Sequence, residues 1–269
     1  MIKKVLFFLF FSFPVLAFTI PENLEQGMFV FGTADKGEKI FYEDIEVPVY
    51  NGKYVFALGR NAPEEIQITI KKGWFEKQVL IFPVKQRSWK KDVFNGVPQK
   101  TVKPSEDDLK RVAKEQKILD KARAQKYFKP DFPTRFYWPL EGRISSPFGA
   151  FRVINGVPQK HHSGLDIAAP KGTPIKATAD GMVVLAENDL FYTGGTILIA
   201  HGGGIVSGYS HLSSLSVKNG DVIKAGDIIG SVGSTGRSTG PHLHFTLSWN
   251  DIRIAPEFIC ERCCPEGDK

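Results

Sequence analysis

Cysteine is scarce in this chain of 269 residues, and its three copies, Cys260, Cys263 and Cys264, all lie within the last ten positions. Cysteines crowded in this way cannot form a disulfide framework for the body of the protein. In an oxidising compartment two of them can pair locally and leave one odd thiol. They can also bind a metal, but the chain has no second pair to complete a structural four-cysteine site. We therefore interpret residues 259–269 as a tail and leave the role of these cysteines open.

Long apolar runs are missing after the N-terminus. The first 17 residues combine a basic start (Lys3 and Lys4), an apolar run at residues 5–15 and a small residue, Ala17. This pattern predicts a cleaved secretory signal peptide, with an uncleaved N-terminal anchor as the alternative. The run is shorter than the roughly 20 residues that a membrane-spanning helix needs, and no later stretch is apolar enough. We expect an exported, soluble mature chain with no stable membrane span after signal cleavage.

Acidic residues are outnumbered, and the net charge is +6. Between residues 85 and 135, 15 Lys and Arg stand against 7 Asp and Glu, so the excess lies in this segment. A basic segment can bind an anionic polymer such as nucleic acid, acidic lipid or cell-wall strands. The export signal argues against nucleic acid, which we do not expect as a partner. The alternative is a helix face that only contacts solvent.

An apolar fraction of 42% predicts a folded protein, and the length suggests two small domains. Residues 18–86 favour a compact, β-sandwich-like domain, because β-branched and aromatic runs alternate there with turn residues. Asn51-Gly52 between two of these runs is a hairpin signal. Nothing in this domain looks catalytic. The expected strands are residues 28–31, 45–50, 54–58, 66–70 and 79–82.

Residues 87–136 are predicted to be a basic linker with one helix at residues 106–125. Ser105 precedes three acidic residues, which is typical of an N-cap followed by negative charge in the first helical turn. Four residues then recur at helical spacing and form a narrow stripe, apolar except for one Gln, that we expect to pack on a domain. The stripe consists of Leu109, Val112, Gln116 and Leu119.

Residues 137–258 contain short apolar runs separated by glycines and show no helical period, which indicates an antiparallel β domain. The predicted fold is therefore mainly β, with a small N-terminal β-sandwich-like domain, a helical linker and a C-terminal antiparallel β domain. All six histidines of the chain fall inside this last domain. Their concentration there suggests a metal site.

Two histidines and a carboxylate have the spacing of metal ligands. His162 and Asp166 stand four residues apart, with Gly164 between them to allow a sharp loop. In the strand expected after residue 241, His242 and His244 would share one face, since residues i and i+2 of a strand point the same way. Leu243 would then face the core.

A catalytic zinc takes three protein ligands and leaves one position open for water. His162, Asp166 and one of the pair His242 and His244 would supply the ligands. The other member of that pair and His211 would act on the bound water or the transition state. The remaining histidines, at positions 161 and 201, fit neither spacing and are interpreted as neighbours of the site or surface residues.

Three motifs, residues 162–166 (HSGLD), 209–212 (YSHL) and 236–245 (GRSTGPHLHF), resemble those of the lysostaphin-type (LytM-like) zinc metallopeptidases, which are murein hydrolases. The resemblance covers roughly residues 138–258, nearly half of the chain, and includes flanking strand and turn motifs. The preceding region is similar, less specifically, to the β-rich N-terminal segment of exported Gram-negative members.

The resemblance implies a zinc metalloendopeptidase with one Zn²⁺ per chain, acting on peptidoglycan in the periplasm or cell envelope. Its zinc ligands would be His162, Asp166 and His244, and its proton-handling pair His211 and His242. The implied bond is the D-alanyl to diaminopimelate cross-link. Some proteins with this domain have lost the ligands and activate cell-wall amidases, and here every ligand position is intact. A further hypothesis is latency, with the N-terminal domain or the basic helix covering the zinc groove.

Overall fold

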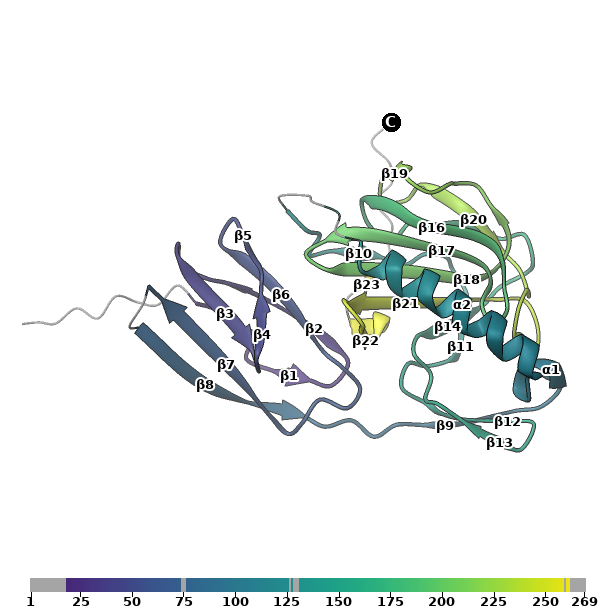
Figure 1. Cartoon of the computed structure of the whole chain (residues 1–269), viewed down its shortest axis with the longest axis horizontal. Coiled ribbons are helices and arrows are strands. Elements are labelled where there is room, and N and C mark those ends of the chain that lie inside the picture. The colour runs from purple at the N-terminus through teal and green to yellow at the C-terminus, as the bar shows by residue number, and fades with distance from the viewer. Residues whose placement is uncertain (1–17, 74–75, 126, 128–130, 259, 262–269) are drawn as a thin grey trace, which may run out of the picture.

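The computed structural model describes residues 18–73, 76–125, 127, 131–258 and 260–261 (Figure 1). The signal-peptide prediction for residues 1–17 falls outside these residues, as do Cys263 and Cys264. Strands dominate the described part and helices are few, which confirms the mainly β fold. No helix in these ranges is both long and apolar enough to cross a membrane.

The N-terminal domain consists of two β-sheets that share one hydrophobic core. Tyr42 of the larger sheet stacks on Phe56 of the smaller one, with ring centroids 4.6 Å apart. The run expected at residues 45–50 is two short strands separated at Pro48, because proline has no N–H for the ladder. The larger sheet has the order β1 (Leu24–Glu25), β8 (Glu76–Lys85), β7 (Glu65–Lys72), β3 (Glu38–Tyr42) and β4 (Ile45–Val47), and the smaller one β2 (Met28–Thr33), β6 (Lys53–Leu58) and β5 (Val49–Tyr50).

The hairpin predicted at Asn51-Gly52 joins β5 to β6. Both residues have positive φ angles, 50° for Asn51 and 75° for Gly52. A two-residue turn with two positive φ angles matches the twist of the flanking strands, and Asn followed by Gly adopts it at low cost.

The C-terminal domain is built on a ten-stranded sheet in which every recorded pair is antiparallel, as predicted. Two of its central strands are largely buried, and three strands of the sheet carry residues of the site described below. Along the main path the order is β11 (Arg143–Ser146), β14 (Leu165–Ala168), β21 (His242–Trp249), β18 (Ile205–Leu215), β17 (Gly194–Gly202), β16 (Gly181–Leu190) and β19 (Val222–Ile223), with β15 (Pro174–Lys176), β20 (Ile228–Val232) and β22 (Ile252–Ile254) paired beside it.

The segment between the two sheets adds regular structure to the C-terminal domain. Strand β9 (Lys91–Phe94) pairs in parallel with β12 (Phe151–Ile154), which forms a hairpin with β13 (Val157–Gln159). Further along the chain come α1 (Gln99–Val102), α2 (Glu106–Arg123) and β10 (Phe136–Tyr137). A short 3-10 helix, Pro256–Phe258, precedes β23 (Cys260–Glu261), which pairs with β10, so Cys260 belongs to a strand.

Helix α2 begins where the sequence predicts and ends two residues earlier. The Ser105 hydroxyl accepts from the backbone N–H of Asp108 at 3.2 Å, and the Asp108 carboxylate accepts from the Ser105 N–H at 3.3 Å. This capping box satisfies two backbone donors that a helix start leaves open. Basic side chains in the last turn, Lys121 and Arg123, complement the helix dipole.

Only part of the predicted apolar stripe of α2 packs on the C-terminal sheet, over which Figure 1 shows the helix lying. Leu119 packs against the cluster that contains Ala122 and buried residues of β16, β17 and β18. Leu109 is 51% exposed, so the packing expected for it is wrong. The first half of the helix is held by polar contacts instead, because Arg111 Nη2 donates to the Asp189 carbonyl at 2.6 Å.

The two domains share a continuous core. Phe29 of β2 approaches Phe136 of β10 with ring centroids 6.1 Å apart, and Phe31 stacks on Phe132 at the same separation. The backbone N–H of Ala255 also donates to the Gly27 carbonyl at 2.7 Å. The N-terminal domain is thus packed against the C-terminal one.

Candidate metal and catalytic site

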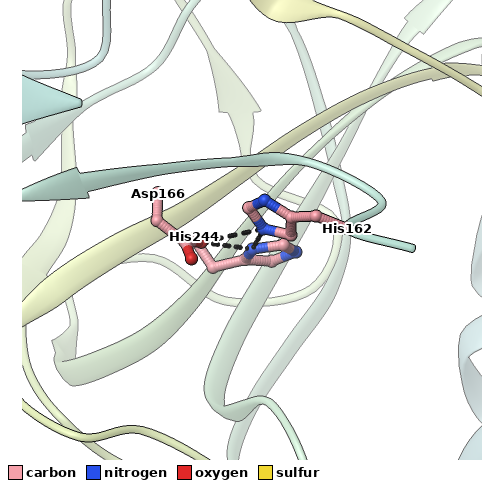
Figure 2. Close-up of side chains that lie close together, drawn as sticks. All are labelled: His162, Asp166 and His244. Atoms are coloured by element: carbon pink, nitrogen blue, oxygen red, sulfur yellow. Dashed lines mark hydrogen bonds and ion pairs between the residues drawn. The ribbon is translucent and has the colours of Figure 1, made fainter. Parts of the chain in front are cut away.

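Two paired strands and the loop before one of them bring His162, Asp166 and His244 together (Figure 2). Asp166 on β14 is the direct partner of His244 on β21. Asp166 Oδ1 lies 2.7 Å from His244 Nδ1 and 3.0 Å from His162 Nε2. The two imidazole nitrogens are 2.9 Å apart. Two histidines and a carboxylate with converging ligand atoms are a donor set that suits zinc.

Gly164 serves this site through close packing. A Cβ at this position would lie 2.4 Å from the Phe245 carbonyl oxygen and 2.9 Å from His244 Cε1. A side chain there would push the loop away from β21 and separate His162 from His244. Glycine is therefore required at position 164 because no side chain fits there. From the sequence alone, glycine is expected to allow a sharp loop.

The Asp166 carboxylate stays ionised in its buried position. Burial alone would raise its pKa, but His162 and His244, by charge and by hydrogen bonds, bring the pKa well below its usual value of 3.8. Arg152 Nη2 donates to Asp166 Oδ2, the oxygen that faces away from the two histidines. Oδ1 is therefore the oxygen available to a cation.

His211 and His242 stand beside the three ligand candidates. Their ring centroids are 4.7 Å apart, and that of His211 is 5.9 Å from that of His244. His242 Nε2 lies 3.9 Å from Asp166 Oδ1. The sequence prediction that His242 and His244 share a face while Leu243 enters the core is confirmed, since Leu243 is fully buried between them.

Backbone carbonyls fix the tautomers of both rings. His211 Nδ1 lies 2.8 Å from the Thr235 carbonyl oxygen, and His242 Nδ1 lies 2.8 Å from that of Gly240. A carbonyl only accepts, so each neutral ring carries its proton on Nδ1 and leaves Nε2 with a lone pair. Burial lowers the pKa of His211 to about 3, which keeps that ring neutral at physiological pH.

The backbone of His211 adopts a positive φ of 67°, an uncommon conformation for a residue with a side chain. Its N–H donates to the Thr193 carbonyl at 2.7 Å, which holds this conformation in place. Such strain is maintained where the surroundings require one side-chain direction, here toward His242.

A cavity of about 600 Å³ opens onto His162, His211 and His244. Its polar lining is cationic: Arg152, Lys160 and Arg237 contribute to it, and no Asp or Glu is among the described residues that line it. Val112 and Gln116 of helix α2 form part of its wall. The cavity is therefore suited to an anionic ligand.

Arg237 is a half-buried cation of this cavity and forms no ion pair with a carboxylate among the described residues. Its guanidinium lies over the Tyr192 ring, 4.6 Å from the centroid. Its recorded hydrogen bond is a long one, 3.4 Å from Nη1 to Gln159 Oε1. Burial lowers its pKa, although a guanidinium stays charged at physiological pH. A partly desolvated cation without a carboxylate partner favours binding of an anion.

The two histidines left unassigned by spacing have different places. His161 is exposed and lines the cavity, so it is a neighbour of the site. His201 is fully buried, and its Nε2 lies 2.7 Å from Ser207 Oγ inside the core. The interpretation of His201 as a neighbour or surface residue is wrong, because its strand β17 is buried on both faces.

Most of these residues lie in a region that matches a known protein family. Residues 160–256 match the model of peptidase family M23. The chain contains an M23 peptidase domain. A structure described as peptidase M23 of Pseudomonas aeruginosa is similar over 85% of this chain and 91% of that one, with a TM-score of 0.66 and 29% sequence identity. The likeness therefore extends beyond the M23 domain into the N-terminal part.

Curated relatives match over the M23 region alone. The DD-carboxypeptidase/endopeptidase Mpg of Neisseria meningitidis is 45% identical over 118 residues, which cover 42% of this chain and 26% of Mpg. The murein hydrolase activator NlpD of Escherichia coli is 39% identical over 119 residues, covering 44% of this chain and 29% of NlpD. The chain thus spans little more than a quarter of the length of these relatives.

Several polar residues at the site were not singled out by the sequence. Arg152 and Asp92 lie outside the matched M23 region, and neither stands in a motif of ligand spacing. Ser146 and Arg237 do occur in the motifs that carried the resemblance, but their side-chain contacts depend on the folded arrangement. Tyr192, which lies beneath Arg237, had no sequence signal.

Proposed function

We propose that this chain is a zinc-dependent endopeptidase that hydrolyses peptide cross-links of peptidoglycan in the periplasm. The observation that carries the proposal is the convergence of His162, Asp166 and His244 at the end of an accessible cavity, next to two further histidines. The predicted signal peptide supports export, and the name of the relative Mpg, a DD-carboxypeptidase/endopeptidase, supports hydrolysis of a peptide bond.

His162 Nε2, Asp166 Oδ1 and His244 Nδ1 would hold one zinc ion per chain. Their chemistry fits the ion: two imidazoles, which bind a metal in their neutral form, and one ionised carboxylate leave room for a fourth, exchangeable position on the cavity side. Bound there, zinc would polarise a scissile carbonyl and lower the pKa of a water molecule toward about 7.

His211 and His242 would handle the protons. In its neutral form each ring presents the lone pair of Nε2, so each can accept a proton from the attacking water and later deliver it to the leaving amine. When protonated, either ring can stabilise the oxyanion of the tetrahedral intermediate. Fixed Nδ1 partners keep both rings in this orientation without reorganisation during the reaction.

The cationic cavity suits a peptide with free carboxylates. A diaminopimelate residue at the cross-link carries such a group close to the scissile amide, and Arg237 is placed to bind it through its unoccupied guanidinium nitrogens. We therefore propose the D-alanyl to diaminopimelate amide as the bond that is cut.

The test is digestion of purified sacculi by the full chain, followed by mass spectrometry of the products. The expected products are monomeric muropeptides released from cross-linked dimers. His211→Ala is the matched inactive control, because it lies outside the ligand set. Release of uncross-linked peptides by an amidase-type cut, or no release by the wild type, would contradict the proposal.

The second candidate is a non-catalytic, zinc-holding activator of a cell-wall amidase, which the similarity to NlpD favours. An activator needs an exposed docking surface and has no need of two oriented, unprotonated histidines beside the ligand set. Adding the chain to an amidase and sacculi separates the two functions. Stimulation that persists in the His211→Ala variant, with no release by the chain alone, supports the activator.

Helix α2 partly covers the cavity. Val112 and Gln116 line the cavity, while His162, His211 and His244 still face it. No residue of the N-terminal β domain is among the described residues that line it. We propose that α2 restricts access for bulky, cross-linked murein and leaves the metal position open to small peptides.

A further inference from the structure

Strand β9 lies between the N-terminal domain and helix α2, outside the matched M23 region, yet it is built into the site. Figure 1 shows it beside β12 and β13. The parallel pairing of β9 with β12 sets Asp92 opposite Arg152 and Phe94 opposite Ile154. Since alternate residues of a strand share a face, Asp92 and Phe94 point to the same side, and Val93 to the other.

Asp92 is hydrogen-bonded to a serine that contacts a ligand candidate. Ser146 Oγ lies 2.5 Å from Asp92 Oδ2 and 3.1 Å from His162 Nδ1. Arg152 Nη2 donates to the same Ser146 oxygen at 3.0 Å. Ser146 is only 1% exposed, so water does not compete for these contacts.

The directions of these hydrogen bonds follow from the groups. A carboxylate only accepts and a guanidinium only donates, so the single Ser146 proton goes to Asp92. The Ser146 oxygen then has lone pairs for Arg152 and for a proton on His162 Nδ1. The Pro147 carbonyl, 2.9 Å from His162 Nδ1, also requires a proton there. In a neutral His162 ring these two acceptors keep the proton on Nδ1, and the Nε2 lone pair then faces Asp166 and His244.

Arg152 connects β9 to the second ligand candidate. Its Nη2 donates to Asp166 Oδ2, and its guanidinium carbon lies 5.4 Å from the centroid of the Phe94 ring. Of the two side chains that β9 directs to this side, Phe94 therefore contacts Arg152, and Asp92 binds the Ser146 hydroxyl to which Arg152 also donates. Strand β9 thus contacts both groups, Ser146 and Arg152, that bind a histidine and a carboxylate of the ligand set, and it does so from outside the matched M23 region.

We propose that Asp92 and Arg152 are positioning residues of the metal centre, so that strand β9 makes the segment before the M23 domain a required part of it. Asp92 acts through Ser146 on the tautomer of His162, and Arg152 acts on the orientation of Asp166. This inference rests on the proposed zinc site. The affinity of that site for zinc depends on Asp92, a residue far from the ligand motifs in the sequence.

The test measures zinc affinity of the full-length protein by competition with a fluorescent chelator. Asp92→Asn keeps the size of the side chain, but its amide can donate to Ser146 and let the hydroxyl turn its proton toward His162. Loss of a group that orients a ligand typically weakens metal binding about 10–100-fold. We expect a loss of about tenfold for Asp92→Asn and a larger one for Asp92→Ala. We also expect activity that is low at limiting zinc and returns when zinc is added.

The matched control is Val93→Ala, on the same strand with a side chain that is 60% exposed on the opposite face. It should bind zinc like the wild type. The visible spectrum of the cobalt-substituted protein gives an independent readout of ligand geometry, and it should change in Asp92→Asn and not in Val93→Ala. Equal affinities in Asp92→Asn and the wild type, or equal losses in Asp92→Asn and Val93→Ala, would overturn the inference. A wild-type chain that binds no zinc would instead contradict the proposed function.

Discussion

The carboxylate of Glu115 accepts a hydrogen bond from the backbone N–H of Phe191 at 2.7 Å, and through it helix α2 is tethered to the loop beside the catalytic groove. The other carboxylate oxygen of Glu115 accepts from Arg111 at 2.6 Å. One side chain thus links the helix to the segment that carries Tyr192, a lining residue of the cavity.

Glu115→Ala should release this tether and speed the digestion of intact sacculi. A hydrogen bond to a charged group contributes about 1.5–3 kcal/mol, so its loss should raise the population of undocked helix roughly tenfold or more. Soluble muropeptide dimers should be cut at nearly the wild-type rate, because they are small enough to enter the groove. Parallel assays on the two substrates measure this selectivity. Lys114→Ala, on the exposed side of α2, is the control, and a variant that loses activity on both substrates would show that the helix is needed as a wall instead.

Substitutions at the four site histidines should separate into two classes by zinc content. His162→Ala and His244→Ala should lose the ion, because each removes a ligand atom. His211→Ala and His242→Ala should retain one zinc per chain and lower kcat by about 10²–10⁴-fold, the usual contribution of a general acid or base. Metal analysis of purified variants beside kinetics on muropeptide dimers gives both values. Zinc loss in His211→Ala would place it among the ligands and refute this division.

Arg237→Ala should raise KM for dimers with a free diaminopimelate carboxylate. A substrate in which that carboxylate is amidated should be cut poorly by the wild type and be little affected by the substitution. Arg237→Lys should rescue only partly, because an ammonium cannot offer the planar pair of donors or stack on Tyr192 in the same way. If Arg237→Ala affects the free and amidated substrates equally, the residue does not read the carboxylate.

Protein freed of metal by a chelator should lose stability in mild acid. Burial lowers the pKa of His211 to about 3 and that of His244 to about 4, whereas both would titrate near 6.5 in the unfolded chain. Below pH 6.5 the unfolded chain therefore binds more protons, and each group costs the folded state about 1.4 kcal/mol per pH unit until its folded pKa is reached. The depressed pKa of Asp166 acts only below its ordinary value of 3.8, outside this window.

Thermal unfolding at pH 7 and pH 5 measures this effect. The Tm of the metal-free wild type should be lower at pH 5 than at pH 7. The difference should be smaller in His211→Asn, because this substitution removes one of the two groups. A Tm that is the same at both pH values, or that falls equally in the variant, would contradict the assignment.

The parts of the fold that depend on local patterns could be predicted from the sequence. Alternating apolar runs predict the strands, Asn51-Gly52 predicts its turn, and Ser105 predicts the start of α2. Spacing and shared face in two short motifs also point to His162, Asp166 and one of the pair His242 and His244 as ligands, and the family resemblance selects His244, which the structure brings together with the other two.

The other features of the fold and of the site depend on how distant segments of the chain pack together, which no local pattern encodes. Asp92 has no ligand spacing and enters the site only because β9 pairs with β12. His201 resembles any other unassigned histidine until the burial of β17 places it in the core. Leu109 continues the apolar stripe of α2 in the sequence, yet it is left half exposed in the fold.

The way in which distant segments build the metal centre also bears on how the protein folds. His162 and His244 are 82 residues apart in the chain, and Asp92 and Ser146 are 54 apart. Contacts over such separations form late, since the entropy of closing long loops must be overcome first. The rate of refolding should therefore hardly change when zinc is present. The ion should instead slow unfolding, because its ligands come together only after the transition state for folding.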